Sequence, residues 1–387
     1  MTDTSRTATG APAATVTEIE KTVDAYLTRS YDADRRRALI GRQGWDPAFL
    51  DELDELGWFA LAVPDEHGGL GLPLSATGAA MLSAGRHLVP GPLPERLLLP
   101  ALLLRHLGSA HPGPDLTGAL VALVDPAALG SWAADDAGLR AGPDGPIGGM
   151  LPVRFAAEAD LLLTVARSAD GNSNGNGNGT VVHLLPADAP GIAVQPVRSA
   201  DPTARLARVT LTRTGRPGPA PVLTGPAADR FATELRAWAR ILAACELSGM
   251  ATRLVEDTTA FVLVRKQFGR PIGSFQAVKH LLADLHTLAS SLRNLCDVTL
   301  ADAAAGSTDT TAGQARSAAV AKAYAADVAV RVAEGAIQLH GGTGFTTETD
   351  LHLYYKRALA LRAWFGDPEE LAHEIGDGLL GGAGGAP

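Results

Sequence analysis

Cysteine is scarce in this sequence. Of 387 residues only two are cysteine, Cys245 and Cys296. So few thiols indicate neither a disulfide framework nor a thiolate metal site. Cys245 also falls in an apolar helical register, which predicts a place in the protein core.

An excess of positive charge and a long apolar run are also lacking. The chain has 33 Lys and Arg against 42 Asp and Glu, a net charge of -9 that argues against nucleic acid as a partner. The longest apolar candidate, residues 97–107, is interrupted by Pro100 and Arg105 and is too short to span a membrane. Residues 1–15 contain no apolar segment typical of a signal peptide. We therefore expect a cytoplasmic protein without a membrane span.

The chain has enough apolar residues for two or three domains, since 46% of its residues are hydrophobic. The period of the apolar pattern changes twice and predicts the domain division. The predicted parts are a disordered lead-in at 1–15, an N-terminal α-helical domain at 16–113, a middle β-domain at 114–224, a C-terminal helical bundle at 225–380 and a disordered tail at 381–387.

Short apolar runs predict the strands of the middle domain, and long stripes predict the bundle. Residues 119–124, 161–165, 181–185 and 207–212 are expected to be strands. Residues 171–179, a Gly/Asn-rich run, are expected to be an unstructured loop. In the C-terminal part, apolar residues recur three and four apart over many turns, which is typical of antiparallel helix bundles. The first such stripe consists of Phe231, Leu235, Trp238, Leu242, Cys245 and Gly249.

Two glycine-containing stretches lie in the predicted bundle. Residues 265–276 read RKQFGRPIGSFQ, and residues 338–345 read QLHGGTGF. The first opens with two cations, breaks at Gly269 and restarts as a helix, for which Ser274 is the predicted N-cap. An arginine at a helix end, glycine-freed backbone and a new helix N-terminus together suit a phosphate or pyrophosphate group. Each stretch alone is also compatible with plain helix capping.

In this order and spacing the two stretches resemble the C-terminal domain of the acyl-CoA dehydrogenase family, whose motifs read R-x-x-F-G-x-x-I-x-x-x-Q and Q-x-x-G-G-x-G. Residues 56–71 read LGWFALAVPDEHGGLG and match the L-G-x-x-x-x-x-x-P-x-x-x-G-G-x-G signature of its N-terminal domain. The resemblance thus covers both ends of the chain. It implies an α+β fold with an N-terminal helical domain, a middle β-domain and a C-terminal antiparallel four-helix bundle.

In the family that this chain resembles, FAD takes a hydride from the β-carbon of an acyl-CoA while a carboxylate removes the α-proton. The resemblance implies an acyl thioester as substrate and an electron-transfer flavoprotein as electron acceptor. It also implies six FAD contacts, shared between neighbouring subunits of an oligomer. These are Arg265, Phe268 and Gln276 from one subunit, and Gln338, Gly341 and Gly342 from the next.

The catalytic base is where the sequence departs from the family. Members carry a glutamate in a turn that reads AWFGD here, which places Phe365 in the glutamate's position. Other members carry it near the start of the first long C-terminal helix, where this chain has Ala239. Neither side chain can accept a proton. Two carboxylates lie nearby, but we expect Asp367 to cap a helix or shape a turn, and Glu246 could either face the site or pair with an arginine.

The middle domain departs too. Members carry a Thr/Ser-Glu-Pro and Gly-Ser-Asp stretch, of which only residues 123–126, LVDP, remain. Members also carry a Lys-x-Trp-Ile-Thr-Asn-like strand against the flavin ring. The matching residues 150–155 read MLPVRF, so Pro152 stands where tryptophan is expected.

Four hypotheses follow, in this order of preference. The first is a hetero-oligomeric acyl-CoA dehydrogenase in which a paralogous subunit supplies the glutamate. The second is a self-sufficient dehydrogenase, for instance a homo-oligomer, that uses Asp367 or Glu246. The third is a flavin-dependent monooxygenase on the same fold, which needs no glutamate because no α-proton is removed. The fourth is a structural partner without flavin.

Overall fold

The computed structural model describes residues 13–42, 45–108, 116–128, 138–142, 145–168, 179–215, 218–305 and 311–380. The predicted tail at 381–387 lies outside these ranges, as do most of the predicted lead-in at 1–15 and most of the predicted loop at 171–179. Ala13, Ala14 and Thr15 form the start of the first helix.

Helices make up the first third of the chain, as predicted. They are α1 (Ala13–Ser30), α2 (Ala33–Gly41), α3 (Pro47–Glu55), the 3-10 helix η1 (Asp65–His67), α4 (Ser75–His87) and α5 (Leu93–Leu107). Almost every residue of α4 is buried, because this helix packs against both α1 and α6 of the C-terminal bundle. The N-terminal helices therefore share one hydrophobic core with the bundle.

An eight-stranded sheet follows, with the order β6-β7-β3-β2-β4-β5-β8 and β1 beside β4. β1 and β2 run parallel to β4, and the other pairs are antiparallel. All four predicted strands are present. The strands are β1 (Val121–Val124), β2 (Arg140–Gly142), β3 (Gly145–Arg154), β4 (Leu161–Ser168), β5 (Thr180–Pro186), β6 (Ile192–Pro196), β7 (Leu206–Leu211) and β8 (Leu223–Thr224).

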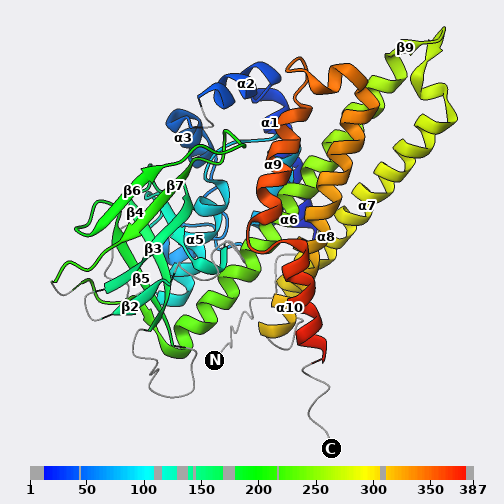
Figure 1. Ribbon diagram of the computed structural model, residues 1–387. Coiled ribbons are helices and arrows are strands. Elements are labelled where there is room, and N and C mark those ends of the chain that lie inside the picture. The colour runs from blue at the N-terminus through cyan, green and yellow to red at the C-terminus, as the bar shows by residue number, and fades with distance from the viewer. Residues whose placement is uncertain are drawn as a thin grey trace, which may run out of the picture.

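Long helices form the C-terminal part and pack beside the sheet (Figure 1). All six residues of the predicted stripe from Phe231 to Gly249 are buried along α6. The elements are α6 (Gly225–Val264), the two-stranded hairpin β9 (Lys266–Gln267) and β10 (Arg270–Pro271), the 3-10 helix η3 (Ile272–Ser274), α7 (Gln276–Ala305), α8 (Thr311–His340), the 3-10 helix η4 (Gly341–Phe345), α9 (Leu351–Ala363) and α10 (Pro368–Leu380). The predicted α+β architecture is confirmed.

Helices α4 and α6 cross with their backbones in contact, and glycine permits it. A Cβ atom built on Gly85 would lie 2.0 Å from the carbonyl oxygen of Glu246, and one built on Gly249 would lie 2.0 Å from that of Leu82. No larger residue fits at either position without moving a helix. The N-terminal helices thus fix the part of α6 that carries Glu246.

None of the helices in the described part of the chain combines the length and the apolar character needed to cross a membrane.

Candidate functional site

The first predicted cofactor motif is a hairpin that projects beyond the end of the bundle (Figure 1). β9 pairs with β10 across a two-residue turn in which Phe268 and Gly269 both have left-handed backbone, with φ of 52° and 80°. Such a turn suits the twist of a short antiparallel pair. Ser274 is not the N-cap of α7, because its hydroxyl donates to the carbonyl of Pro271 at 2.7 Å and the helix begins only at Gln276. That prediction was wrong.

The second predicted motif lies at the same end of the bundle. Phe261, near the end of α6, stacks on His340 at the end of α8, with ring centroids 4.1 Å apart. This contact brings η4 next to the base of the hairpin. The six residues expected to contact FAD are all exposed at this end, namely Arg265, Phe268, Gln276, Gln338, Gly341 and Gly342.

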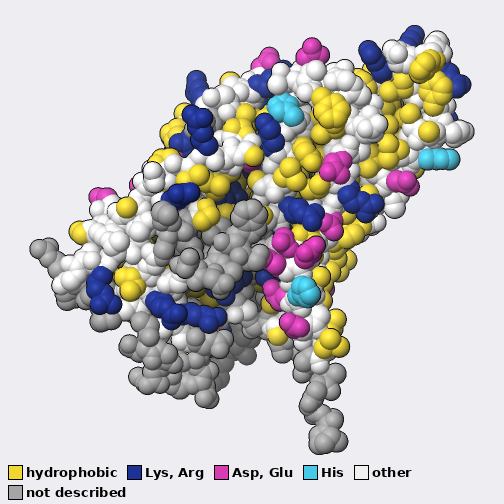
Figure 2. All heavy atoms as spheres, viewed as in Figure 1, with side chains coloured by type: hydrophobic (Ala, Val, Ile, Leu, Met, Phe, Trp, Pro, Cys, Tyr) yellow, Lys and Arg dark blue, Asp and Glu magenta, His cyan; other side chains and the backbone are white. Residues whose placement is uncertain are grey.

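Large apolar side chains are also exposed at this end of the molecule. The exposed fractions are 63% for Leu263, 75% for Val264, 91% for Phe268 and 80% for Phe345. Figure 2 shows apolar and basic side chains together over the hairpin. Apolar side chains that gather on a surface mark a place where a ligand or another protein binds. We name this end of the bundle, residues 263–276 and 338–345, the bundle tip.

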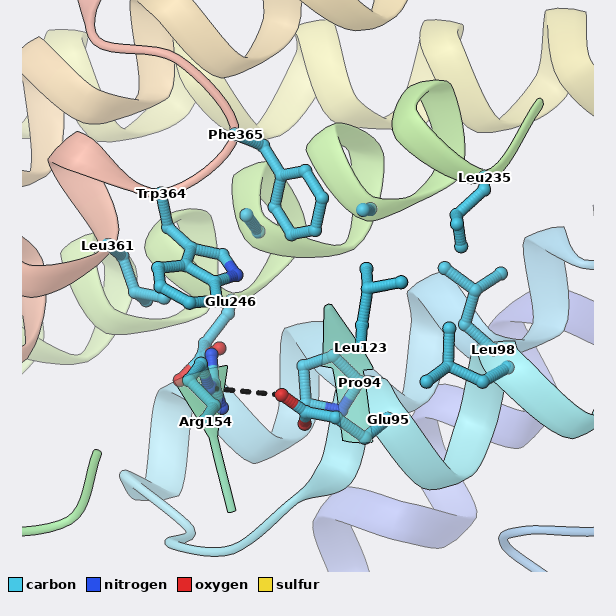
Figure 3. A pocket seen from close by; sticks show the side chains of 13 residues that line it. Pro94, Glu95, Leu98, Leu123, Arg154, Leu235, Glu246, Leu361, Trp364 and Phe365 are labelled. Atoms are coloured by element: carbon cyan, nitrogen blue, oxygen red, sulfur yellow. Dashed lines mark ion pairs between the residues drawn. The ribbon is translucent and has the colours of Figure 1, made fainter. Parts of the chain in front are cut away.

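The two usual positions of the base meet at one cavity. Ala239 of α6 and Phe365 of the turn after α9 both line a cavity of about 30 Å³, which we call the inner cavity. Glu95 of α5, Arg154 of β3 and Glu246 of α6 line it too (Figure 3). Among the described side chains around this cavity, only Glu95 and Glu246 are carboxylates.

Glu246 faces the inner cavity and also pairs with an arginine. Its Oε1 accepts from Nη1 of Arg357 at 2.7 Å, and Nε of Arg357 donates to Oδ2 of Asp201 at 2.6 Å. All three side chains are buried. Burial alone would raise the pKa of Asp201, but Arg357 and Thr203 outweigh burial and hold that pKa below its usual value. Oε2 of Glu246 has no hydrogen-bond partner among the described residues.

Glu95 and Arg154 form another buried ion pair at the inner cavity, and the sequence did not lead us to predict either as a site residue. Oε1 of Glu95 lies 3.1 Å from Nε of Arg154, and Figure 3 shows the pair along one edge of the cavity. Burial raises the pKa of Glu95, with Glu246 raising it further and Arg154 opposing the shift. A charged residue in the leucine-rich helix LPERLLLPALLL was the available signal, since glutamate is seldom buried without a partner.

Asp367 caps a helix, as expected. Its Oδ1 accepts from the backbone N–H groups of Glu369 at 2.8 Å and Glu370 at 3.0 Å, at the start of α10. Oε2 of Glu370 accepts in return from the N–H of Asp367 at 3.2 Å. This reciprocal arrangement is a capping box. Asp367 is also absent from the lining of the inner cavity.

A larger cavity of about 330 Å³ lies beside the inner one, between β3, the loop before β7, and α9. We call it the outer cavity. Pro152 of β3, Arg357 and Leu359 line it, together with three residues that also line the inner cavity, namely Arg154, Leu361 and Trp364. β3 is the strand that the resemblance sets against a flavin ring. The space beside it lies within the range of about 300–1,000 Å³ that ligand pockets have.

Comparison with known proteins agrees with these observations. Residues 14–95 match the profile of the acyl-CoA dehydrogenase N-terminal domain, and residues 230–380 match that of the acyl-CoA dehydrogenase C-terminal domain. The chain is 33% identical over 341 residues to acyl-CoA dehydrogenase IpdE2 of Mycobacterium tuberculosis, covering 88% of this chain and 89% of that protein. The chain belongs to the acyl-CoA dehydrogenase family. The predicted class, a flavoprotein oxidoreductase acting on CH–CH groups, is thereby confirmed.

Two solved structures are similar over nearly the whole chain. The first is the Tcur3481-Tcur3483 steroid ACAD G363A variant, with a TM-score of 0.80, 27% identity, and coverage of 96% of this chain and 99% of that one. The second is PigA with FAD and proline, with a TM-score of 0.81, 18% identity, and coverage of 96% and 98%. The second likeness shows the fold alone.

FAD is the cofactor of the family, and the bundle tip fits its pyrophosphate and adenosine. Arg265 is exposed there, and a Cβ atom on Gly341 or Gly342 would meet nothing within 4 Å, so backbone can approach a ligand closely. The residues expected to contact the flavin ring differ from the family's motif. The outer cavity has room beside β3, but Pro152 gives no aromatic surface and Arg154 stands where the motif has threonine.

Proposed function

We propose that this protein is a subunit of a hetero-oligomeric, FAD-dependent acyl-CoA dehydrogenase that desaturates an acyl thioester between its α- and β-carbons. It is the subunit that lacks the base, and a paralogous chain supplies the glutamate. The observation that carries the proposal is the inner cavity. Both usual base positions meet there, and they hold Phe365 and Ala239.

The chemistry requires a carboxylate that is free to accept a proton. The α-proton of a thioester is weakly acidic, so the base must lie in a dry site within reach of the reacting carbon. Bound FAD supplies the hydride acceptor. Phe365 and Ala239 have no proton-accepting group. Both carboxylates at the inner cavity are paired with arginines: Glu246 with Arg357, and Glu95 with Arg154.

The bundle tip supports a role in shared FAD binding. Its cation, its open glycines and its exposed apolar side chains suit both a nucleotide and a second subunit. The Tcur3481-Tcur3483 steroid ACAD carries the names of two proteins, so a two-chain arrangement has a precedent on this fold. An electron-transfer flavoprotein is the proposed electron acceptor.

The visible spectrum of the flavin tests the proposal. The chain is purified anaerobically, alone and after mixing with a glutamate-bearing paralogue, and each sample receives a panel of acyl-CoAs. We expect the flavin band to bleach only when the paralogue is present. Bleaching by the chain alone would establish a self-sufficient enzyme. Turnover with reduced flavin and oxygen, without bleaching by any acyl-CoA, would establish the monooxygenase instead.

One observation favours the self-sufficient dehydrogenase as a second candidate. Oε2 of Glu246 has no hydrogen-bond partner among the described residues, and Glu246 lines the same cavity as Phe365. If the chain alone bleaches its flavin, Glu246→Gln tests whether Glu246 is the base. Loss of bleaching in this variant would make Glu246 the base.

A further inference from the structure

Three side chains separate the two cavities: Arg154, Leu361 and Trp364 line both of them. Figure 3 shows the Trp364 ring lying over the Arg154 side chain, which points from β3 towards Glu95 of α5. The guanidinium carbon of Arg154 lies 5.8 Å from the centroid of the Trp364 ring. The partition therefore consists of Arg154, Leu361 and the Trp364 ring, and Glu95 is the counter-ion that holds Arg154 in place.

The position of this partition matters because of what the reaction requires. In a dehydrogenase of this family the reacting carbons lie between the flavin and the base. In this chain the strand associated with the flavin borders the outer cavity, and both base positions border the inner one. The side chains shared by the two cavities therefore stand where the reacting carbons would have to lie.

We propose that Arg154, held by Glu95 and covered by Trp364, keeps an acyl group out of this chain, so that each pair of this chain and its partner binds one acyl thioester rather than two. This inference rests on the proposed function and assigns Arg154 and Glu95 as the residues that decide substrate access.

The dimensions and burial of the cluster support this assignment. The inner cavity measures about 30 Å³, which is room for a few water molecules and not for an acyl chain. Arg154 is 6% exposed and Glu95 is 7% exposed, so the pair is held inside the protein between the two cavities. Moving Arg154 alone would leave the Glu95 carboxylate buried without a counter-ion.

Binding of hexanoyl-CoA to the full chain alone, measured by equilibrium dialysis, tests the inference without depending on turnover. We expect no saturable binding to the wild-type chain. The charge-neutral double variant Glu95→Leu with Arg154→Thr removes the arginine from the partition together with its counter-ion, and we expect saturable binding at least about tenfold tighter than any wild-type binding. Quenching of Trp364 fluorescence, absent in Trp364→Phe, would place the ligand at the cavities.

Two further variants keep the inference falsifiable. Glu95→Gln with Arg154→Met removes the charges but keeps the bulk, and we expect it to bind no better than wild type. Glu20→Leu with Arg293→Leu removes an ion pair between α1 and α7, outside both cavities, and controls for the loss of a pair. Circular dichroism confirms that each variant is folded.

One hexanoyl-CoA bound per wild-type chain, unchanged in the double variants, would overturn the inference. That result would leave the proposed function standing, because partner-dependent bleaching is a separate measurement. Bleaching by the chain alone, in turn, would overturn both.

Discussion

The ammonium group of Lys322 lies 3.2 Å from the carbonyl oxygen of Gly366 and 3.1 Å from that of Arg362. These two carbonyls flank the turn that carries Trp364 and Phe365. Lys322 is fully buried in α8 beneath that turn. Two further hydrogen bonds connect the turn to other parts of the chain. The N–H of Phe365 donates to the carbonyl of Ala128, and Nε of Arg240 donates to the carbonyl of Phe365. The backbone at the empty base position is therefore firmly fixed.

The stability of the protein should rise with pH because of Lys322. Burial lowers the pKa of Lys322 to about 7; Arg240 and Arg362 lower it further, while Asp367 and Glu370 oppose them. Between about pH 7 and about pH 10 the unfolded chain thus binds more protons at this lysine than the native chain, so the free energy of unfolding increases with pH. Lys322→Met should flatten that rise in urea titrations. Equal slopes for both proteins would refute this account.

Arg357→Met should destabilise the protein strongly, because Glu246 and Asp201 would lose their common buried partner. Breaking a buried pair in this way costs about 3–5 kcal/mol. Arg362→Met is a matched control on the same helix, since Arg362 pairs with Asp327 at the surface and should contribute less than about 1 kcal/mol. Urea unfolding at neutral pH measures both. Equal losses for the two variants would contradict the assigned role of Arg357.

Asp367→Ala should lower stability without removing a base. Loss of an N-cap costs about 1 kcal/mol, while flavin bleaching in the complex with the paralogue should continue at an unchanged rate. Asp367→Asn keeps a capping oxygen and should recover most of the stability. Loss of bleaching in the asparagine variant, with the fold intact, would mean that Asp367 takes part in the chemistry.

Gly342→Ala should weaken FAD retention while leaving the fold intact. Among the described residues, a Cβ atom at Gly342 meets nothing within 4 Å, so we expect any effect to arise from something bound there. Gly344→Ala provides the contrast, because its Cβ atom would lie 2.5 Å from the carbonyl oxygen of Ile337. We expect only the second variant to lose thermal stability. The ratio of flavin to protein absorbance after gel filtration of the complex measures the first effect.

Much of the fold could be predicted because periodicity is a local property. The apolar stripe on α6 and the short runs of β4 and β5 report which face of each segment is buried. The burial of α4 on nearly all sides could not be predicted in this way, because it depends on α1 and α6 enclosing it. The cap at Ser274 failed for a related reason, since Ser274 belongs to the 3-10 helix η3 and its hydroxyl donates to the Pro271 carbonyl instead.

The site was only half predictable. Motif order identified the bundle tip and the two base positions, because those residues belong to short continuous stretches. Glu95 belongs to no such stretch. Arg154 lies in the strand motif at 150–155, but its partner could not be predicted, because the pairing joins α5 to β3 across 59 positions of sequence (154 minus 95). For Glu246 the sequence left two roles open, and the fold combines them: one oxygen binds Arg357, and the other has no hydrogen-bond partner in the described part of the chain.

The contact between Gly85 and Glu246 affects how the protein unfolds. Because the α4 and α6 backbones touch at two glycines, the N-terminal helices and the bundle cannot separate without exposing the core that they share. Segments that sequence profiles divide into two domains should therefore melt in one calorimetric transition. A fragment consisting of the bundle alone would expose the apolar groove that α4 fills, and we expect it to aggregate rather than fold.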